Sequence, residues 1–441
     1  MAATVLATTT IRATRTRSVR HLVLGWMLMF PFVFYAARGT FSFEGNHNIP
    51  GGTGSLAGLA GSGRNLGFLG QIVIPGAAYG IVLWLIVMNA RRIASLALQM
   101  KMITLLALLT ICSALWSQDP FRSTYNGVFY FIDTLFAFYL VLKFDTEEIM
   151  SLVMMGGVSV SVLCLIMVFF FPQYGTLHGT IWRGIFGDRT QAAKCLVFLL
   201  SPAIIFRRRS FSYRHMIYIA LMSLIIFMEY AMTARILLLV YIALMASISV
   251  SSKFGRRSSL LIIGMLLAAA ALLVCIGLPF FPRLLEGMGK NATLTGRIPI
   301  WTALLRSIAK RPLLGYGFYA FWLGMKGESA NEILAAHWVY GYAHNGYLEI
   351  CVQLGLVGVA LFFVTLFQAI RNAWFCLRNG CPPGVEWYIG VIALTIMYNV
   401  DESTVVWPFE ILSILYVVAC CGLAKAARRL RDVKTIEALY N

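Results

Sequence analysis

The chain has 441 residues, of which 59% are hydrophobic and only 12% are charged. A soluble domain has roughly 45–50% apolar and about 25% charged residues, so this composition excludes a soluble globular protein and indicates insertion into a lipid bilayer. The formal net charge of +18 would suggest nucleic acid as the partner of a soluble protein. In a membrane protein it reflects basic loops and contact with anionic headgroups, so we expect no nucleic-acid partner.

Apolar runs close to the ~20 residues needed to span a bilayer recur from end to end. No stretch is left that could form a separate soluble domain. We therefore predict an all-α, polytopic integral membrane protein with one domain over residues 1–441. About 12 transmembrane helices are predicted, over residues 21–37, 67–90, 95–116, 124–142, 149–171, 191–206, 215–232, 235–252, 259–280, 347–370, 386–400 and 408–424.

Lys and Arg residues are concentrated in alternate connecting segments, beginning with the N-terminal segment and ending with the C-terminal one. By the positive-inside rule these segments are cytoplasmic, which places both termini inside. The first apolar run follows basic residues, as in a signal peptide, but Tyr35 is too bulky for the candidate cleavage site. We therefore predict an uncleaved first span.

The longest break between spans, residues 281–347, is predicted to lie on the outer, periplasmic side. It contains seven basic residues and three acidic ones. A solvated surface and a site that attracts an anion both explain this excess, and charge alone slightly favours the solvated surface.

Within this loop, apolar residues repeat at helical spacing, at Trp301, Leu304, Leu305 and Ile308. Basic residues occupy the opposite face, so we predict an amphipathic helix that lies in the membrane interface. Pro299 fits a first helical turn, and the segment Pro-Leu-Leu-Gly-Tyr-Gly at 312–317 supplies the residues that end the helix.

His344 is the candidate general base, because it directly precedes a long apolar span. Asn345 can cap that helix, and a helix N-terminus favours a neutral imidazole. A neutral imidazole at the water interface can accept a proton. Taken alone, however, a histidine at the start of a helix is more often a capping or packing residue than a catalytic one, and the spacing does not decide between the two. There is no Asp-x-Asp or His-x-x-x-His motif and the histidines do not cluster, so we predict neither a metal site nor a cofactor.

Three arginines are candidates for binding a phosphate group on the outer face. Arg297 begins the predicted amphipathic helix, Arg235 follows a short outer turn, and Arg183 lies in the loop before residue 191. Arginine binds phosphate through two parallel hydrogen bonds and keeps its charge at any relevant pH. For any one of them in isolation we favour contact with lipid headgroups, whereas several together favour a phosphate site.

Two charged residues fall inside predicted spans, Asp133 in the fourth and Lys101 in the third. A charge within the bilayer is costly, so such residues are paired or functional. We predict a structural ion pair between adjacent helices in preference to a proton relay.

Four segments of the chain together resemble one known family. They are Leu-Trp-Ser-Gln-Asp-Pro at 115–120, Trp-Arg-Gly-Ile-Phe at 182–186, Leu-Thr-Gly-Arg-Ile-Pro-Ile-Trp at 294–301 with the segment at 312–317, and His-Asn-Gly-Tyr-Leu-Glu at 344–349 with Gly-Leu-Val-Gly at 355–358. In type and order they are similar to segments of the O-antigen ligase and exopolysaccharide polymerase family. The residues after Phe186, Gly-Asp-Arg, depart from the family's usual His-Lys-Asn.

The resemblance implies a GT-C-like membrane glycosyltransferase of the bacterial inner membrane, with its active site on the periplasmic face. Its donor would be a saccharide on undecaprenyl diphosphate, and its acceptor a saccharide or a lipid-linked glycan. Transfer would be inverting and metal-independent, with His344 as general base and Arg235 and Arg297 on the donor diphosphate. Arg183 and Asn345 are further candidates for substrate binding. Other polysaccharide export proteins are candidate partners.

Three functions remain open at this point. The layout and the segment at 115–120 favour a polymerase of polysaccharide repeat units. A ligase that moves finished glycan to lipid A core or protein is the alternative within the class. A secondary transporter is the alternative from another class, although transporters tend to have paired broken helices in repeated halves.

Overall fold

The computed structural model describes residues 31, 73–177, 179–186, 189–209, 213–251, 297–330 and 341–440. The predicted span over residues 259–280 lies outside these residues, as does the predicted span over 21–37 except for Pro31. The first part of the long loop, residues 281–296, lies outside them as well.

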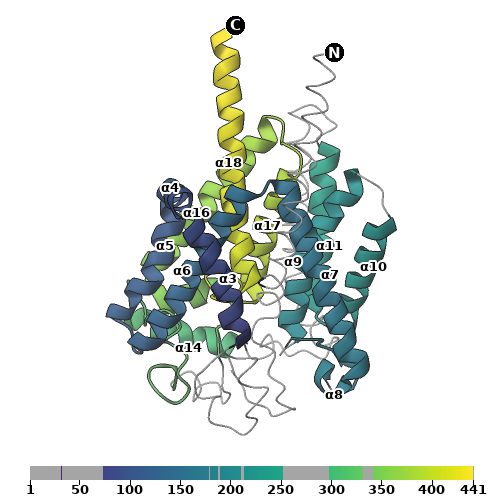
Figure 1. The fold of residues 1–441 in the computed structure, drawn as a ribbon. Helices are drawn as coiled ribbons and strands as arrows, with labels where there is room; N and C mark the ends of the chain where they lie inside the picture. Colours follow the sequence, from purple (N-terminus) through teal and green to yellow (C-terminus); the bar gives the residue numbers. More distant parts are fainter. Residues whose placement is uncertain are drawn as a thin grey trace, which may run out of the picture.

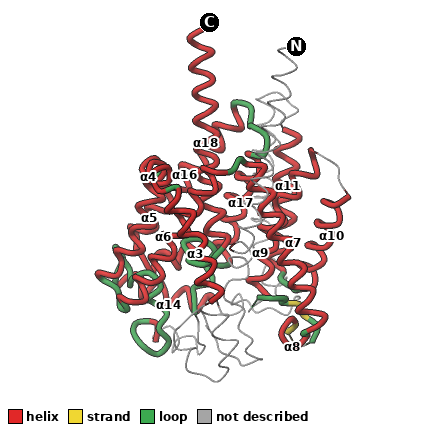
Figure 2. Tube along the Cα trace, in the orientation of Figure 1, coloured by secondary structure: helices red, strands yellow, loops and turns green. Residues whose placement is uncertain are grey.

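The described part of the chain is built mainly from helices (Figures 1 and 2). One short antiparallel hairpin pairs Thr176 with Trp182 and Leu177 with Ile181. In chain order the elements are α3 Ile74–Met88, α4 Ala90–Gln99, α5 Lys101–Cys112, η3 Ser113–Leu115, α6 Pro120–Lys143, α7 Thr146–Phe170, α8 Pro172–Gly175, β1 Thr176–Leu177, β2 Ile181–Trp182, α9 Arg189–Arg209, α10 Tyr213–Met228, α11 Met232–Ser251, α14 Arg297–Lys310, α16 Gly346–Arg378, α17 Val385–Asp401 and α18 Ile411–Tyr440.

Two groups of helices meet at α17. Helices α5, α6, α16 and α18 pack against one another, and α9 packs against α7, α10 and α11. Helix α17 contacts α16 and α18 in the first group and α9 and α11 in the second. The apolar residues of α18 are buried around most of its circumference, as expected for a helix in the middle of a bundle. Its C-terminal turns project beyond the other helices (Figure 1).

Several helices have the length and composition of membrane spans. In the described ranges, four of them, α6, α7, α16 and α18, are long and apolar enough to cross a bilayer, and α3 with α4 is a fifth candidate as a bent pair. The chain is therefore a helical protein with several apolar helices that fit a multi-pass membrane protein. The full set of about 12 spans and the side on which each loop lies remain predictions.

The segment predicted as one span over residues 95–116 is divided into two helices at Met100. Helix α4 bends by 84° from α3, and α5 begins only at Lys101. The reason is composition, because α4 carries Arg91 and Arg92 and buries only Ile93. Such an amphipathic helix is suited to a membrane surface and not to the hydrocarbon core.

The predicted ion pair between Asp133 and Lys101 is wrong. Asp133 is buried, and its two carboxylate oxygens accept hydrogen bonds from the Tyr79 hydroxyl and the Phe409 backbone N–H, both at 2.8 Å. Lys101 is exposed as the first residue of α5. The carboxylate is thus held by hydrogen bonds that link α3, α6 and the loop before α18.

Helix α16 is broken at Gly355, and the loop at 312–317 fills the break. Gly355 has φ +64°, and next to it Tyr316 N–H donates to Val352 O at 3.0 Å while Gly317 N–H donates to Gln353 O at 2.9 Å. In the other direction, Leu356 N–H donates to Pro312 O at 2.8 Å. Non-helical backbone within an apolar bundle requires such partners. The loop supplies them.

The segment Leu115–Pro120 holds the same loop from its other side. Trp116 Nε1 donates to Leu314 O at 2.8 Å, and Gln118 N–H donates to Tyr316 O at 3.1 Å. Just beyond the segment, Ser123 Oγ donates to Phe318 O at 2.8 Å. Residues 115–123 thus hold the loop at 312–318, and this loop in turn bonds to the backbone of the broken helix.

Replacing Gly355 by alanine should destabilise the protein strongly. A side chain in this conformation, with φ +64° and ψ −165°, costs about 1–3 kcal/mol, and the added Cβ would lie 2.2 Å from Leu313 O. Thermal unfolding of the purified full-length protein in detergent measures this. The matched control is Gly76→Ala in α3, where, apart from the neighbouring backbone of the helix itself, no described residue lies within 4 Å of the new Cβ. Equal apparent melting temperatures for the two variants would contradict the role of the break.

Candidate functional site

The start of α16 places His344 against the end of α17. Asn345 is the N-cap, as the sequence predicts, because its side-chain oxygen accepts from the N–H groups of Tyr347 and Leu348, both at 3.0 Å. Its amide nitrogen donates to Val400 O at 3.1 Å. A Cβ on Gly346 would lie 1.8 Å from Asn399 Oδ1, so only glycine permits this approach. The two helix ends are therefore in direct contact.

Two side chains fix the backbone just before His344. The N–H of Ala343 donates to Glu349 Oε2 at 2.6 Å, and its carbonyl accepts from Trp301 Nε1 at 2.9 Å. Glu349 is buried in the first turn of α16, where the helix dipole favours a negative charge, and it also accepts from Trp322 Nε1 at 2.9 Å. The anchors come from α14, α16 and the loop between them, so the position of His344 is set by three separate parts of the chain.

His344 itself has an unusual backbone and a partly open side chain. Its φ of +48° is uncommon for a residue other than glycine, although histidine tolerates it better than most residues. The imidazole lies against the ring of Tyr342, with 4.0 Å between centroids, and is 26% exposed. A strained residue held by its surroundings at a solvent-accessible position is a reason to suspect function.

Glu402 connects His344 to Arg297. One oxygen, Oε1, lies 3.2 Å from His344 Nδ1 and 3.1 Å from Arg297 Nη2, and the Glu402 side chain is only 2% exposed. The other terminal nitrogen of Arg297 contacts Asp401. Two neighbouring carboxylates at the end of α17 therefore hold one guanidinium and one imidazole.

The charges around Glu402 decide its pKa. Burial acts to raise it, but the hydrogen bond and charge of His344 and the charges of Lys194 and Arg297 outweigh burial, so the pKa is lowered from its ordinary value. The group is therefore an anion at neutral pH. A carboxylate can only accept hydrogen bonds, so His344 Nδ1 carries a proton that it donates to Glu402.

A second ion pair lies behind this group. Lys194 of α9 is buried, and its ammonium lies 3.3 Å from Glu410 Oε1 and donates to Ser403 O at 3.2 Å. These contacts join α9 to both ends of the loop between α17 and α18. The loop carries Glu402, so the pair positions it.

Helix α14 spans Arg297–Lys310, where the sequence predicts an amphipathic helix. The residues on its buried face differ in part from those predicted. Ile300 and Leu304 are buried with Ala303, whereas Leu305 is 56% exposed. The apolar face packs on Tyr316, Phe321 and Val352. Arg297 and Trp301 are four residues apart and so lie on one side of the helix, which explains why both reach the site.

The backbone near Arg235 lies close to the site, but the guanidinium of Arg235 does not contact the residues that hold His344. Two residues earlier, Thr233 Oγ1 donates to Asp401 Oδ2 at 2.6 Å. Side chains two apart on a helix point in different directions, and the Arg235 guanidinium lies over the rings of Phe227 and Tyr230 and donates to Phe227 O. Its predicted role in binding diphosphate stays a prediction.

Arg183 supports a hairpin elsewhere on the molecule. Its Nε donates to Tyr174 O at 2.7 Å and its backbone N–H donates to Gly175 O at 2.9 Å. Partial burial lowers the pKa of its guanidinium from the ordinary value. Through these bonds Arg183 stabilises the hairpin. Its predicted contact with substrate stays a prediction.

The sequence interpretation missed Asp401, Glu402 and Thr233. A signal was available for the two acids, since two adjacent carboxylates directly follow a predicted span. Nothing in the sequence indicates that they meet Arg297, which lies 104 and 105 residues earlier.

A pH titration should reveal the ionised Glu402. A carboxylate whose pKa is lowered in the folded protein stabilises it at any pH above its ordinary value of 4.5, and this stabilisation is lost as the pH falls through the lower, folded value. We expect Glu402→Gln to cost about 1.5–3 kcal/mol at pH 7, as for a hydrogen bond to a charged group. The gap in thermal stability between wild type and variant should close only below about pH 4.5. An equal gap at pH 7 and pH 3 would contradict an ionised Glu402.

A family of known proteins matches the part of the chain that contains most of these residues. Residues 217–363 match the model of a family described as O-antigen ligase. This range includes Arg235, Arg297, His344 and Asn345, whereas Asp401 and Glu402 lie beyond it.

A curated relative is the exopolysaccharide production protein ExoQ of Rhizobium meliloti (strain 1021). It is 28% identical over 152 residues, which are 33% of this chain and 34% of the relative. The match therefore spans about a third of the length of that protein. Together, the two matches show that about a third of the chain is similar to proteins of the O-antigen ligase and exopolysaccharide production type.

Proposed function

We propose that the protein is a glycosyltransferase that uses a saccharide on undecaprenyl diphosphate as donor, at the periplasmic face of the bacterial inner membrane. The single observation that carries this proposal is the shared oxygen of Glu402, which lies 3.2 Å from the imidazole of His344 and 3.1 Å from the guanidinium of Arg297. A base and a phosphate-binding cation are thus held together, and the transfer of a sugar from a diphosphate needs both.

In the proposed reaction, His344 Nε2 accepts the proton of the acceptor hydroxyl. The acceptor oxygen then forms a bond to the anomeric carbon, with inversion, as the bond between that carbon and the diphosphate oxygen breaks. Undecaprenyl diphosphate leaves with the bonding electron pair. Glu402 positions the imidazole and stabilises the charge it gains, as a carboxylate does for other catalytic histidines.

Arg297 is proposed to stabilise the departing diphosphate. A guanidinium has five N–H donors, and Asp401 and Glu402 occupy only two of its nitrogens. The 28% exposed Asp401 is the carboxylate that a diphosphate would displace, whereas buried Glu402 would keep the guanidinium in place. Fixed donors of this kind stabilise a developing negative charge without a metal ion.

We favour polymerisation of repeat units, because the curated relative takes part in exopolysaccharide production. The description of the matched family as O-antigen ligase supports a second candidate, transfer of finished glycan to lipid A core or protein. A transporter is not favoured, because the backbone groups exposed by the break in α16 are taken up by residues 312–317 and so are not directed at a substrate.

The glycan profile of a deletion strain tests the proposal and separates its two forms. A polymerase predicts loss of polymer and accumulation of single lipid-linked repeat units. A ligase predicts long polymer that remains on the lipid carrier. An unchanged profile would contradict both.

A further inference from the structure

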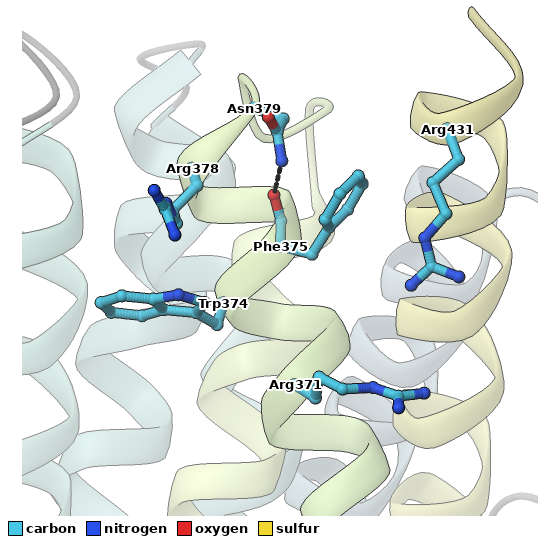
Figure 3. Close-up of a pocket in the computed structure, with 6 residues that line it drawn as sticks. All are labelled: Arg371, Trp374, Phe375, Arg378, Asn379 and Arg431. Atoms are coloured by element: carbon cyan, nitrogen blue, oxygen red, sulfur yellow. Dashed lines mark hydrogen bonds between the residues drawn. The ribbon is translucent and has the colours of Figure 1, made fainter. Parts of the chain in front are cut away.

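A basic cavity lies at the end of the bundle opposite His344. It is formed by α4, α5, α6, α16 and α18 and has a volume of about 690 Å³, within the range of ligand sites. A second hollow of about 520 Å³ shares Arg371 and Arg431 with it and continues along the end of α16 (Figure 3). Six cationic side chains line the larger cavity: Arg91, Arg92, Arg371, Lys425, Arg428 and Arg431.

The interior of the larger cavity is apolar. Ile103, Ala369 and Cys420 line it and are buried. In the described part of the chain, no carboxylate lines either cavity, and Asp432 of α18 is not among the lining residues. A ligand that fits this lining has an apolar portion and an anionic head.

The side chains that bond to these cations are uncharged and so do not neutralise them. Arg428 donates to Gln99 Oε1 at 2.6 Å, and Arg431 donates to Asn372 Oδ1 at 3.3 Å while it lies over the ring of Phe375. These contacts orient the guanidiniums and leave the positive charge. The Arg371 side chain makes no hydrogen bond or ion pair with any residue that the structure describes.

The two shared arginines point into the space between α16 and α18. Figure 3 shows Arg371 extending from α16 toward α18, and Arg431 extending from α18 toward the level of Arg371. Two like charges directed into one space repel each other unless an anion lies between them. Trp374, 45% exposed at the same end of α16, is an aromatic residue of the kind found at the headgroup level of membranes.

The orientation of helix α4 indicates where this cavity lies along the normal of a bilayer. Its bend of 84° from α3 lays it across the bundle end, and it contributes Arg91 and Arg92 to the rim. An amphipathic helix perpendicular to an apolar one is the geometry of a helix in the membrane interface. The rim would therefore lie among the headgroups, on the side that the positive-inside rule predicts to be cytoplasmic.

We propose that this cavity is a binding site for an anionic phospholipid of the cytoplasmic leaflet. The phosphate lies among the guanidiniums of Arg371 and Arg431, and an acyl chain lies along the apolar wall between α16 and α18. Basic pockets between membrane helices on this side recognise lipid headgroups in this way. The site is separate from the proposed transfer reaction at the other end of the bundle.

Lipid titration of the purified full-length protein in a non-ionic detergent tests the proposal. We expect dioleoylphosphatidylglycerol to raise the apparent melting temperature in a saturable manner. The same concentrations of dioleoylphosphatidylcholine, which lacks a net charge, should not. Inorganic phosphate is the third arm, and it should give a much smaller shift because it lacks the acyl chain.

Arg371→Gln should weaken the phosphatidylglycerol effect about fivefold in apparent affinity, as expected for one basic residue near an anionic headgroup. It should leave the lipid-free protein as stable as wild type, because the Arg371 side chain bonds to no residue in the described part of the chain. Arg371→Lys should restore most of the affinity. The matched control is Arg214→Gln on α10, an exposed arginine that lines neither cavity.

Three results would overturn the proposal. They are equal shifts with phosphatidylcholine and phosphatidylglycerol, a shift with inorganic phosphate as large as that with the lipid, and equal loss of affinity in Arg371→Gln and Arg214→Gln. The last would mean that overall charge and not this cavity attracts the lipid.

Discussion

Replacing His344 by alanine is expected to lower glycan formation by a factor of about 10²–10⁴, the usual contribution of a general base. The alanine variant keeps the backbone anchors of residue 343 and the cap at Asn345, because neither involves the imidazole. The folded protein should therefore accumulate normally. The measurement is the amount of polymer in a deletion strain that expresses the variant, with the protein level determined in the same membranes.

His215→Ala is the control for this experiment. It removes the same side chain from the start of α10, away from the residues that hold His344. Normal polymer from His215→Ala and almost none from His344→Ala is the predicted pattern. Near-normal polymer from His344→Ala would show that the histidine only caps and packs, which was the alternative left open by the sequence.

Arg297→Lys is expected to lower activity about 10²-fold, although it keeps the charge. The guanidinium contacts Asp401 with one terminal nitrogen and Glu402 with the other, and an ammonium cannot reproduce this fork. The remaining donors would no longer be aimed at the position proposed for the diphosphate, and loss of one such donor costs about 10²–10³ in rate. The rate should be measured with purified protein and a lipid-linked donor.

Arg306→Lys provides the matched control, because Arg306 is an exposed arginine on the same helix. It should have wild-type activity. If Arg297→Lys is equally active, a bidentate contact is not needed, and binding of lipid headgroups becomes the better account of Arg297. Melting temperatures of both variants show whether any loss comes from unfolding.

The local features of the site could be predicted from the sequence. The capping role of Asn345 depends only on the residues that follow it, and Arg297–Lys310 is helical because its apolar residues recur at helical spacing. The exposed face of that helix was predicted less well. Leu305 was assigned to the apolar face, but Ile300 and Ala303 pack inward in its place because the surrounding loop provides a core for them.

The long-range features could not be predicted in this way. The pairing of Glu402 with His344 joins residues 58 apart, and the insertion of residues 312–317 into the break of α16 depends on the three-dimensional path of the loop. Asp133 shows the same limit. Its depth in α6 was correctly recognised as costly, but its partners, Tyr79 and the Phe409 N–H, come from 54 and 276 residues away.

The most direct test of the central claim is transfer by the purified full-length protein in proteoliposomes that contain lipid-linked repeat units. We predict that each new glycosidic bond is accompanied by release of one undecaprenyl diphosphate, that the reaction continues in the presence of a metal chelator, and that His344→Ala lacks it. Absence of transfer by the wild-type protein, or full transfer by His344→Ala, would contradict the account.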